Sequence, residues 1–101
     1  MAFERVCALA EVPPDSVIEV MVRGQFYAIC NVKGAITALS GVCPHAGGPL
    51  GQGQISDGKI VCPFHMWAFE CATGRHEFVT SLSVPAFAVQ VRDGDVFVDL
   101  P

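Results

Sequence analysis

Charged residues are scarce in this chain of 101 residues, which has six Lys and Arg against ten Asp and Glu and a formal net charge of −4. The six cationic residues are scattered along the chain as Arg5, Arg23, Lys33, Lys59, Arg75 and Arg92. A protein that binds a nucleic-acid backbone needs a clustered basic face. The composition therefore argues against nucleic acid as a partner.

Long apolar runs are also missing, although 51% of the residues are hydrophobic. The longest apolar stretches have the length of a strand and fall well short of the roughly 20 residues that a membrane helix needs. The N-terminal segment has no apolar run long enough for an export signal, and Glu4 and Glu11 interrupt it. We therefore expect a cytoplasmic protein without a membrane partner.

An even set of cysteines is lacking too, since the chain has five. In a chain that is not exported, thiols stay reduced, so the cysteines favour metal ligation over a disulfide framework. A domain of this size buries a modest share of its surface and often depends on a metal or a disulfide. A stabilising cofactor is consistent with both observations.

Helical periodicity is absent, and short apolar blocks rich in Val, Ile, Phe and Tyr alternate with glycine-containing turns. This pattern predicts an all-β fold in one domain, residues 1–101. The expected strands are Phe3–Leu9, Ser16–Val22, Gln25–Val32, Ala35–Ser40, Gly53–Ser56, Lys59–Cys62, Ala68–Glu70, Ala86–Arg92 and Asp95–Asp99. Four pairs supply the positive φ of tight hairpins, namely Arg23-Gly24, Lys33-Gly34, Asp57-Gly58 and Asp93-Gly94.

Two segments interrupt the strand pattern and hold paired potential metal ligands. The first contains Cys43-Pro44-His45 and the second Cys62-Pro63-Phe64-His65, with sixteen residues between His45 and Cys62. Two thiolates and two imidazoles could bind one zinc ion, but a zinc finger usually supplies a cysteine pair first and a histidine pair later. One Cys and one His from each loop suit a cluster of two irons, which the loops can hold from two sides.

In this respect the sequence resembles the Rieske iron–sulfur proteins, whose motif is Cys-x-His followed by Cys-x-x-His. The stretches Gly47–Gly51, Ile55–Val61 and Ala68–Gly74 extend the resemblance over most of the chain. It implies antiparallel β-sheets with a cluster-binding subdomain at about residues 41–75. It also implies one [2Fe–2S] cluster, with Cys43 and Cys62 on one iron and His45 and His65 on the other.

The resemblance implies a one-electron carrier, as in the ferredoxin component of bacterial aromatic-ring-hydroxylating dioxygenase systems. Its partners would be a flavoprotein NAD(P)H-dependent ferredoxin reductase and a terminal oxygenase, which a monomer would meet in transient complexes. The chain would not be an enzyme alone, since only His76 remains for a second iron site that needs two histidines and a carboxylate. The alternatives are a small subunit or regulatory module of a larger oxidoreductase such as nitrite reductase, a redox sensor, and a structural zinc domain.

Two absences favour the low end of the Rieske range of reduction potentials. High-potential Rieske proteins carry an extra cysteine in each ligand loop, joined as a disulfide, where this chain has Gly48 and Phe64. They also use a serine and a tyrosine whose hydrogen bonds to sulfur raise the potential. Here Met66 and Trp67 follow His65, and neither has a hydroxyl group.

Several other residues are expected to have structural or supporting roles. The three remaining cysteines, Cys7, Cys30 and Cys71, are expected to be inert buried thiols. His76 is expected at a surface turn. Phe64 and Trp67 are expected to be core residues that shield the cluster, and Pro49 and Leu50 to form part of a docking surface. Pro44 and Pro63 are expected to shape the loops so that the sulfurs accept backbone N–H bonds.

Overall fold

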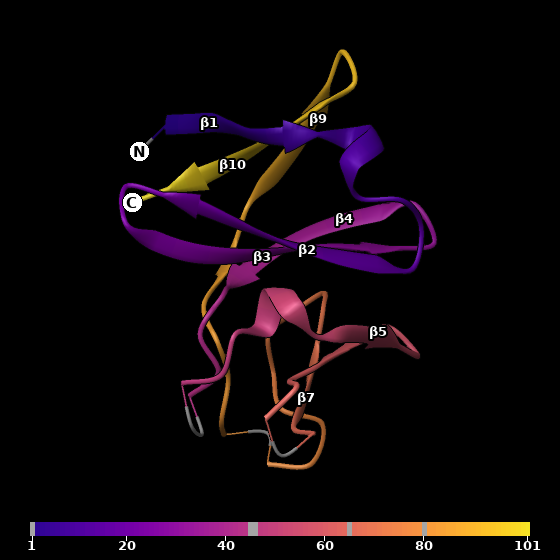
Figure 1. Ribbon diagram of the computed structural model, residues 1–101, viewed down its shortest axis with the longest axis vertical. Coiled ribbons are helices and arrows are strands. Elements are labelled where there is room, and N and C mark those ends of the chain that lie inside the picture. Colours follow the sequence, from indigo (N-terminus) through magenta and orange to yellow (C-terminus); the bar gives the residue numbers. More distant parts are fainter. Residues whose placement is uncertain (1, 45–46, 65, 80) are drawn as a thin grey trace.

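The fold consists of three antiparallel sheets, seen in a computed structural model that describes residues 2–44, 47–64, 66–79 and 81–101. The strands are β1 (Ala2–Ala8), β2 (Ser16–Val22), β3 (Gln25–Val32), β4 (Ala35–Ser40), β5 (Gln54–Ser56), β6 (Lys59–Val61), β7 (Ala68–Glu70), β8 (Ala86–Phe87), β9 (Val89–Arg92) and β10 (Asp95–Leu100). Their orders are β1-β10-β9, β2-β3-β4-β8 and β5-β6-β7. The first two sheets stack in the upper part of Figure 1, and the third lies below them.

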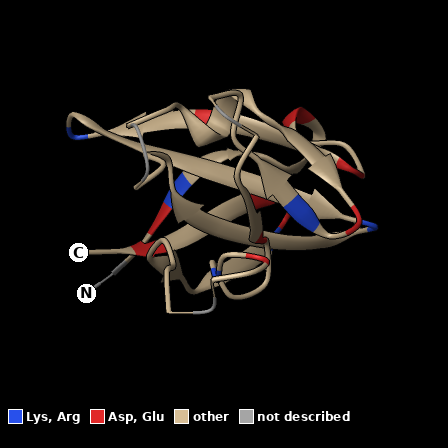
Figure 2. Ribbon diagram, turned by 90° about the horizontal axis from the view of Figure 1, so that it is seen from below, with Lys and Arg blue, Asp and Glu red and all other residues tan. Residues whose placement is uncertain are grey.

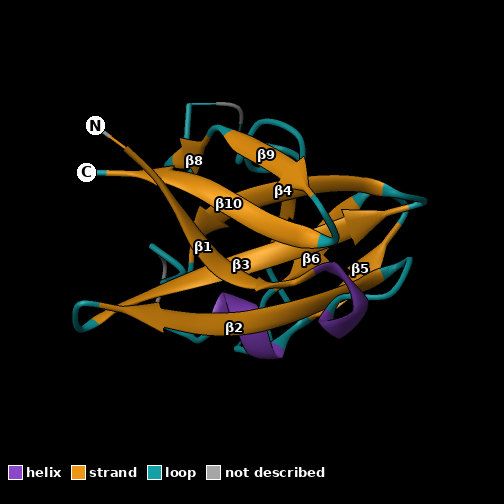
Figure 3. Cartoon of the chain, turned by 90° about the horizontal axis from the view of Figure 1, so that it is seen from above, coloured by secondary structure: helices purple, strands orange, loops and turns teal. Residues whose placement is uncertain are grey.

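The all-β prediction is confirmed. Figure 3 shows strands and loops together with two short 3-10 helices, η1 (Leu9–Glu11) and η2 (Leu50–Gln52). The four predicted hairpin pairs all adopt positive φ at both residues, for example Asp57 at 51° and Gly58 at 74°. Two consecutive residues in this region match the turn type whose twist suits a tight hairpin. Within the described residues, no helix is long and apolar enough to cross a membrane.

Strand β3 separates two hydrophobic cores. Tyr27 and Ile29 face the upper core, which β3 shares with β1 and β10. Ala28 and Cys30 face the lower core, which β3 shares with β6, β7 and the ligand loops. Neighbouring side chains of a strand point to opposite faces, so both faces of β3 are buried and its residues form an almost continuous apolar run. The strand thereby joins the upper sandwich to the lower part that carries the two loops.

The prediction of a single strand over Ala86–Arg92 is wrong, because this segment forms two strands, β8 and β9. Ala86 and Phe87 pair with β4 in the middle sheet, whereas Val89–Arg92 pairs with β10 in the upper sheet. Ala88 lies between them, and its carbonyl accepts a hydrogen bond from the Asp99 N–H at 3.0 Å. The segment changes sheets at this residue, which apolar alternation cannot reveal because either sheet can bury the same side chains.

Candidate metal centre

The first predicted ligand loop follows β4 and is closed by its own backbone. The Leu50 N–H donates to the Gly41 carbonyl at 3.0 Å, the Cys43 N–H to the Gly48 carbonyl at 2.9 Å, and the Gly47 N–H to the Cys43 carbonyl at 2.9 Å. Gly47 has a φ of +69°, a region that glycine enters without a steric penalty. The loop therefore turns tightly around Cys43 instead of continuing as a strand.

The second predicted ligand loop joins β6 to β7. The Cys62 N–H donates to the Trp67 carbonyl at 2.7 Å, so the loop closes directly on the cysteine. The Phe64 N–H points back to Cys62 Sγ, at an N···S distance of 3.4 Å. This contact confirms the expected N–H bond to sulfur at Cys62, and it would stabilise negative charge on that sulfur.

The two loops meet at Gly48. A Cβ placed on this residue would lie 2.8 Å from Cys62 Sγ and 3.0 Å from Phe64 Cγ. No side chain fits there without moving the sulfur or the aromatic ring. Gly48 therefore allows the first loop to approach the thiol of the second.

The thiols of Cys43 and Cys62 lie together in the lower core, with exposed fractions of 1% and 0%. Burial raises the pKa of the Cys62 thiol, the Phe64 N–H opposes that shift, and a hydrogen bond with Cys43 adds to it. The Cys62 thiol is therefore hard to ionise without a cation nearby, because its thiolate would lie in an apolar setting. An iron centre supplies that positive charge.

The remaining predicted ligands, His45 and His65, lie outside the described residues. Within the described ranges, no three His, Cys, Asp or Glu side chains form a group that could hold a metal ion. The structure therefore brings together the two cysteines and leaves the two histidines as predictions. The pair of buried thiols, the sulfur-directed N–H and the space left by Gly48 fit a centre that takes two thiolates on one iron.

The three other cysteines are buried, as expected. Cys7 lies in the upper core, and Cys30 and Cys71 lie in the lower core, with exposed fractions of 3%, 0% and 1%. A hydrogen bond joins the thiols of Cys30 and Cys71; it is the main cause that raises the pKa of Cys30 and lowers that of Cys71. None of the five cysteines forms a disulfide.

Two supporting predictions about the loops are wrong. Leu50 is fully buried in the lower core, so it cannot form a docking surface. Phe64 is 48% exposed, so it is not a core residue, whereas Trp67 packs partly buried against the lower core. The closed loops turn Leu50 into the core and Phe64 toward solvent, although both side chains are hydrophobic.

The prediction that His76 lies at a surface turn is also wrong. The side chain is only 8% exposed and packs edge-on against Trp67 and Phe69, with ring centroids 4.8 and 5.4 Å apart. Its Nδ1 accepts hydrogen bonds from the Phe78 N–H at 3.1 Å and the Val79 N–H at 3.0 Å. The sequence offers no signal for this role, because the acceptor position depends on how the following residues fold back.

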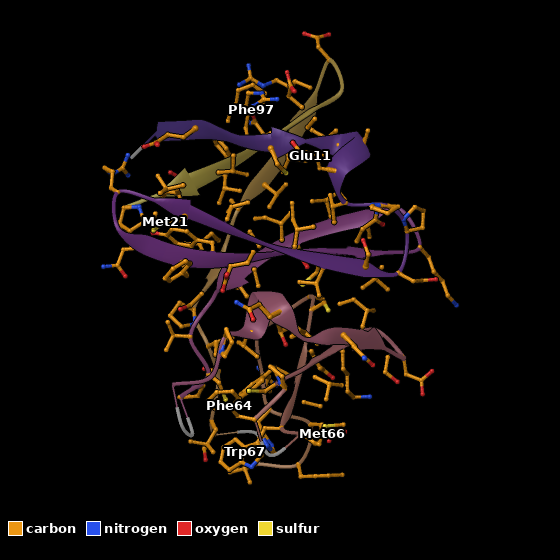
Figure 4. All side chains as sticks on the ribbon, viewed as in Figure 1. Glu11, Met21, Phe64, Met66, Trp67 and Phe97 are labelled. Atoms are coloured by element: carbon orange, nitrogen blue, oxygen red, sulfur yellow. The ribbon has the colours of Figure 1, made fainter. Side chains whose placement is uncertain are left out.

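Sequence reasoning also missed a group of exposed apolar side chains around the ligand loops. We call it the apolar tip and define it as Val42, Pro44, Pro63, Phe64 and Met66, all of which are exposed. Figure 4 shows Phe64, Met66 and Trp67 together at the lower end of the molecule. The available signal was apolar residues within glycine- and proline-rich loops, where no strand alternation would bury them.

Replacing Gly48 by alanine is expected to weaken cluster retention by about 10- to 100-fold, the usual effect of disturbing the surroundings of a metal ligand. The new Cβ would displace the sulfur of Cys62. Iron and sulfide content after gel filtration provides the measurement. Gly47→Ala is the control, since no atom of the described residues lies within 4 Å of its added Cβ and only its φ of +69° is strained; equal iron loss in both variants would contradict the role of Gly48.

The chain matches a known protein family. Residues 2–88 match the family model described as Rieske [2Fe-2S] domain. The biphenyl dioxygenase ferredoxin subunit of Pseudomonas sp. (strain KKS102) is 32% identical over 101 residues, covering 98% of this chain and 93% of that protein.

Two solved structures have a similar fold. The ferredoxin of Sphingomonas yanoikuyae B1 has a TM-score of 0.89 and 28% identity, covering 99% of this chain and 100% of that one. A chain in the complex of reduced oxygenase and oxidized ferredoxin of carbazole 1,9a-dioxygenase has a TM-score of 0.85 and 29% identity, covering 95% and 91%. The protein therefore belongs to the family of Rieske [2Fe–2S] domains and carries one [2Fe–2S] cluster.

Proposed function

We propose that this protein is a one-electron carrier that takes electrons from a flavoprotein NAD(P)H-dependent ferredoxin reductase and delivers them to the terminal oxygenase of an aromatic-ring dioxygenase system. Cys43, Cys62, His45 and His65 hold the cluster. The observation that carries the proposal is the meeting of two buried cysteine thiols directly behind an exposed apolar tip. The match to a dioxygenase ferredoxin subunit over nearly the whole of both chains supports it.

The apolar tip suits brief contact with a partner protein. Phe64 and Met66 are 48% and 69% exposed, which is unusual for large apolar side chains unless they take part in recognition. Residues 41–50 and 60–69 contain no Lys, Arg, Asp or Glu, so the ligand loops themselves carry none of these charges. A docked partner would exclude water here without having to desolvate a charge.

The net charge of −4 acts from other parts of the molecule. Figure 2, seen from the end that bears the site, shows acidic and basic positions scattered over strands and turns rather than gathered into one area. Such a distribution can speed an encounter with a basic partner without fixing a tight complex. This suits a carrier that must leave one partner before it meets the next.

The chain does not oxidise a substrate itself under this proposal. Among the described residues, no group of three His, Cys, Asp or Glu side chains could form a second metal site. His76, the one histidine left after the proposed ligands, is enclosed by aromatic rings, and its Nδ1 accepts two backbone hydrogen bonds. One domain of 101 residues, residues 1–101, then serves only to carry and present the cluster.

The reduction potential is expected to lie closer to the lower limit of Rieske centres, about −150 mV, than to the upper limit of about +300 mV. Tyr27 is the one tyrosine of the chain, and it lies in the upper core, on the face of β3 away from Cys43 and Cys62. Its hydroxyl therefore cannot donate to a cluster sulfur and raise the potential. A redox titration followed by circular dichroism gives the value, and a midpoint above about +150 mV would contradict the expectation.

The function is tested first by electron paramagnetic resonance of the reduced protein, combined with metal analysis. A rhombic signal of low average g with two irons per chain supports the cluster, whereas a silent sample with stoichiometric zinc refutes it. Electron transfer is then followed by stopped-flow mixing with the reductase and terminal oxygenase of a biphenyl dioxygenase system. Stable co-purification with a large catalytic subunit would instead favour the alternative, a small subunit of an oxidoreductase such as nitrite reductase.

A further inference from the structure

Next to the second ligand loop, residues 76–79 expose two more apolar side chains. Phe78 is 80% exposed and Val79 is 46% exposed. A phenylalanine exposed to this extent buries little of its ring, so packing within the chain does not explain its position. The question is what holds this segment in place.

His76 holds it through one ring nitrogen. Nδ1 accepts the Phe78 N–H at 3.1 Å and the Val79 N–H at 3.0 Å. A nitrogen that accepts hydrogen bonds carries no proton, so the neutral imidazole has its proton on Nε2. The buried ring thus satisfies two backbone donors that a strand or helix would otherwise have to pair.

The rest of the segment is also anchored through its backbone. The Glu77 N–H donates to the Ala68 carbonyl of β7 at 3.0 Å, and the His76 N–H donates to the Leu82 carbonyl at 2.9 Å. The Leu82 N–H in turn donates to the Val79 carbonyl at 2.9 Å. Backbone hydrogen bonds on both sides of Phe78 and Val79 therefore tie these two residues to β7 and to Leu82.

This turn is connected to the metal centre through Trp67. The Trp67 ring packs edge-on against His76 with centroids 4.8 Å apart, and the Trp67 carbonyl accepts the Cys62 N–H at 2.7 Å. On the surface, Met66 of the apolar tip and Glu77 line the same shallow hollow. Figure 1 shows this stretch of chain, drawn in orange, at the same lower end as the two ligand loops.

On the basis of the proposed function, we infer that His76 is a positioning residue, and that Phe78 and Val79 form a second part of the surface that docks the terminal oxygenase. Glu77, the residue before Phe78, lines the same hollow as Met66 of the apolar tip, so one partner can cover both parts. Glu77 is half-buried and is the one charged residue among residues 76–79. The surface therefore fits an apolar patch of a protein, with Lys59 and the acidic Asp57 and Glu77 at its polar rim.

The positioning role is tested without a partner. In His76→Leu the acceptor is lost, and we expect the amides of Phe78 and Val79 to exchange with deuterium about tenfold faster. In His76→Asn the side-chain Oδ1 can take the place of Nδ1, so protection is expected to return. The measurement is hydrogen–deuterium exchange by mass spectrometry on the cluster-loaded protein.

The docking role is tested by the second-order rate of electron transfer from the reduced chain to terminal oxygenases of biphenyl and carbazole dioxygenases. The variant Phe78→Ser/Val79→Ser is expected to lower this rate about tenfold or more, a typical effect of removing a buried apolar contact from an interface. The midpoint potential should stay unchanged. Met21→Ser is the matched control, because Met21 is 63% exposed but lies in the upper sandwich, away from the tip (Figure 4).

The results distinguish the docking surface from the positioning role of His76. Wild-type transfer rates in Phe78→Ser/Val79→Ser overturn the docking surface, and equal loss of protection in His76→Leu and His76→Asn overturns the positioning role. A concentration-dependent dimer that Phe78→Ser abolishes would assign the surface to a second copy of the chain. If the wild-type protein reduces neither oxygenase, the proposed function and the docking surface fail together, while the exchange data still decide the role of His76.

Discussion

Cys62→Ala is expected to leave the protein without its cluster, with complete loss of the visible colour and of the reduced-state paramagnetic resonance signal. The side chain is fully buried beside Cys43, and Sγ receives the Phe64 N–H at 3.4 Å, so no exposed group can replace the missing thiolate. A vacant ligand position in this core would leave iron with an incomplete shell. Iron and sulfide analysis of the purified variant gives the result.

Cys71→Ala provides the matched control for this experiment. Cys71 belongs to the same core and is 1% exposed, so both variants remove one buried sulfur and leave a similar cavity. Its thiol forms a hydrogen bond with Cys30 rather than with the proposed ligand pair. We expect Cys71→Ala to keep two irons per chain; a full cluster in Cys62→Ala, or an equal loss in Cys71→Ala, would refute the proposed ligand set.

The same measurement extends to the ligands that lie outside the described residues. His45→Ala and His65→Ala are each expected to release the cluster, since a Rieske centre needs both imidazoles on its second iron. His76→Asn should retain the cluster, because His76 accepts backbone hydrogen bonds instead of binding metal.

Gly74→Ala is expected to lower the free energy of unfolding by about 3–5 kcal/mol. Gly74 has a φ of +79°, and an added Cβ would lie 2.3 Å from the Val84 carbonyl oxygen. The neighbouring backbone is held by the Gly74 N–H to Glu70 at 2.7 Å and by the Val84 N–H to Gly74 at 2.8 Å. Neither of the two segments in this contact can move without breaking one of these bonds.

Gly94→Ala separates steric collision from backbone strain. Gly94 has nearly the same φ, +78°, but none of the described parts of the chain places an atom within 4 Å of its added Cβ. Gly94→Ala should lower the free energy of unfolding by only about 1 kcal/mol, the cost of placing alanine in the left-handed conformation. The shift of the urea midpoint, followed by the fluorescence of Trp67, measures both variants; equal shifts would mean that the contact with Val84 relaxes freely.

Much of the fold follows from local chemistry along the chain. The strands β2, β3, β4 and β7 have the predicted bounds, and the four hairpin pairs supply the positive φ that fixes each turn. Strand alternation and turn residues act over a few neighbours, so sequence alone reveals them. The order and spacing of Cys43, His45, Cys62 and His65 likewise indicated the family before any geometry was known.

The predictions from sequence are wrong where contacts between distant segments decide the structure. Ala86–Arg92 breaks at Ala88 because two different sheets compete for its two halves. Leu50 is buried and Phe64 exposed because each ligand loop closes on itself and turns its side chains accordingly. Hydrophobicity favours burial of both residues equally and cannot choose between them.

The sequence by itself determined the strands, the hairpins, the family and the proposed ligand types, because these depend on residue identity and short spacing. Only the tertiary structure decided that the thiols of Cys43 and Cys62 meet, that Gly48 leaves room for them, and that His76 is buried with its Nδ1 on the backbone of Phe78 and Val79. Each of these depends on contacts between loops, whose closure is set by hydrogen bonds and packing across the chain rather than by any local pattern.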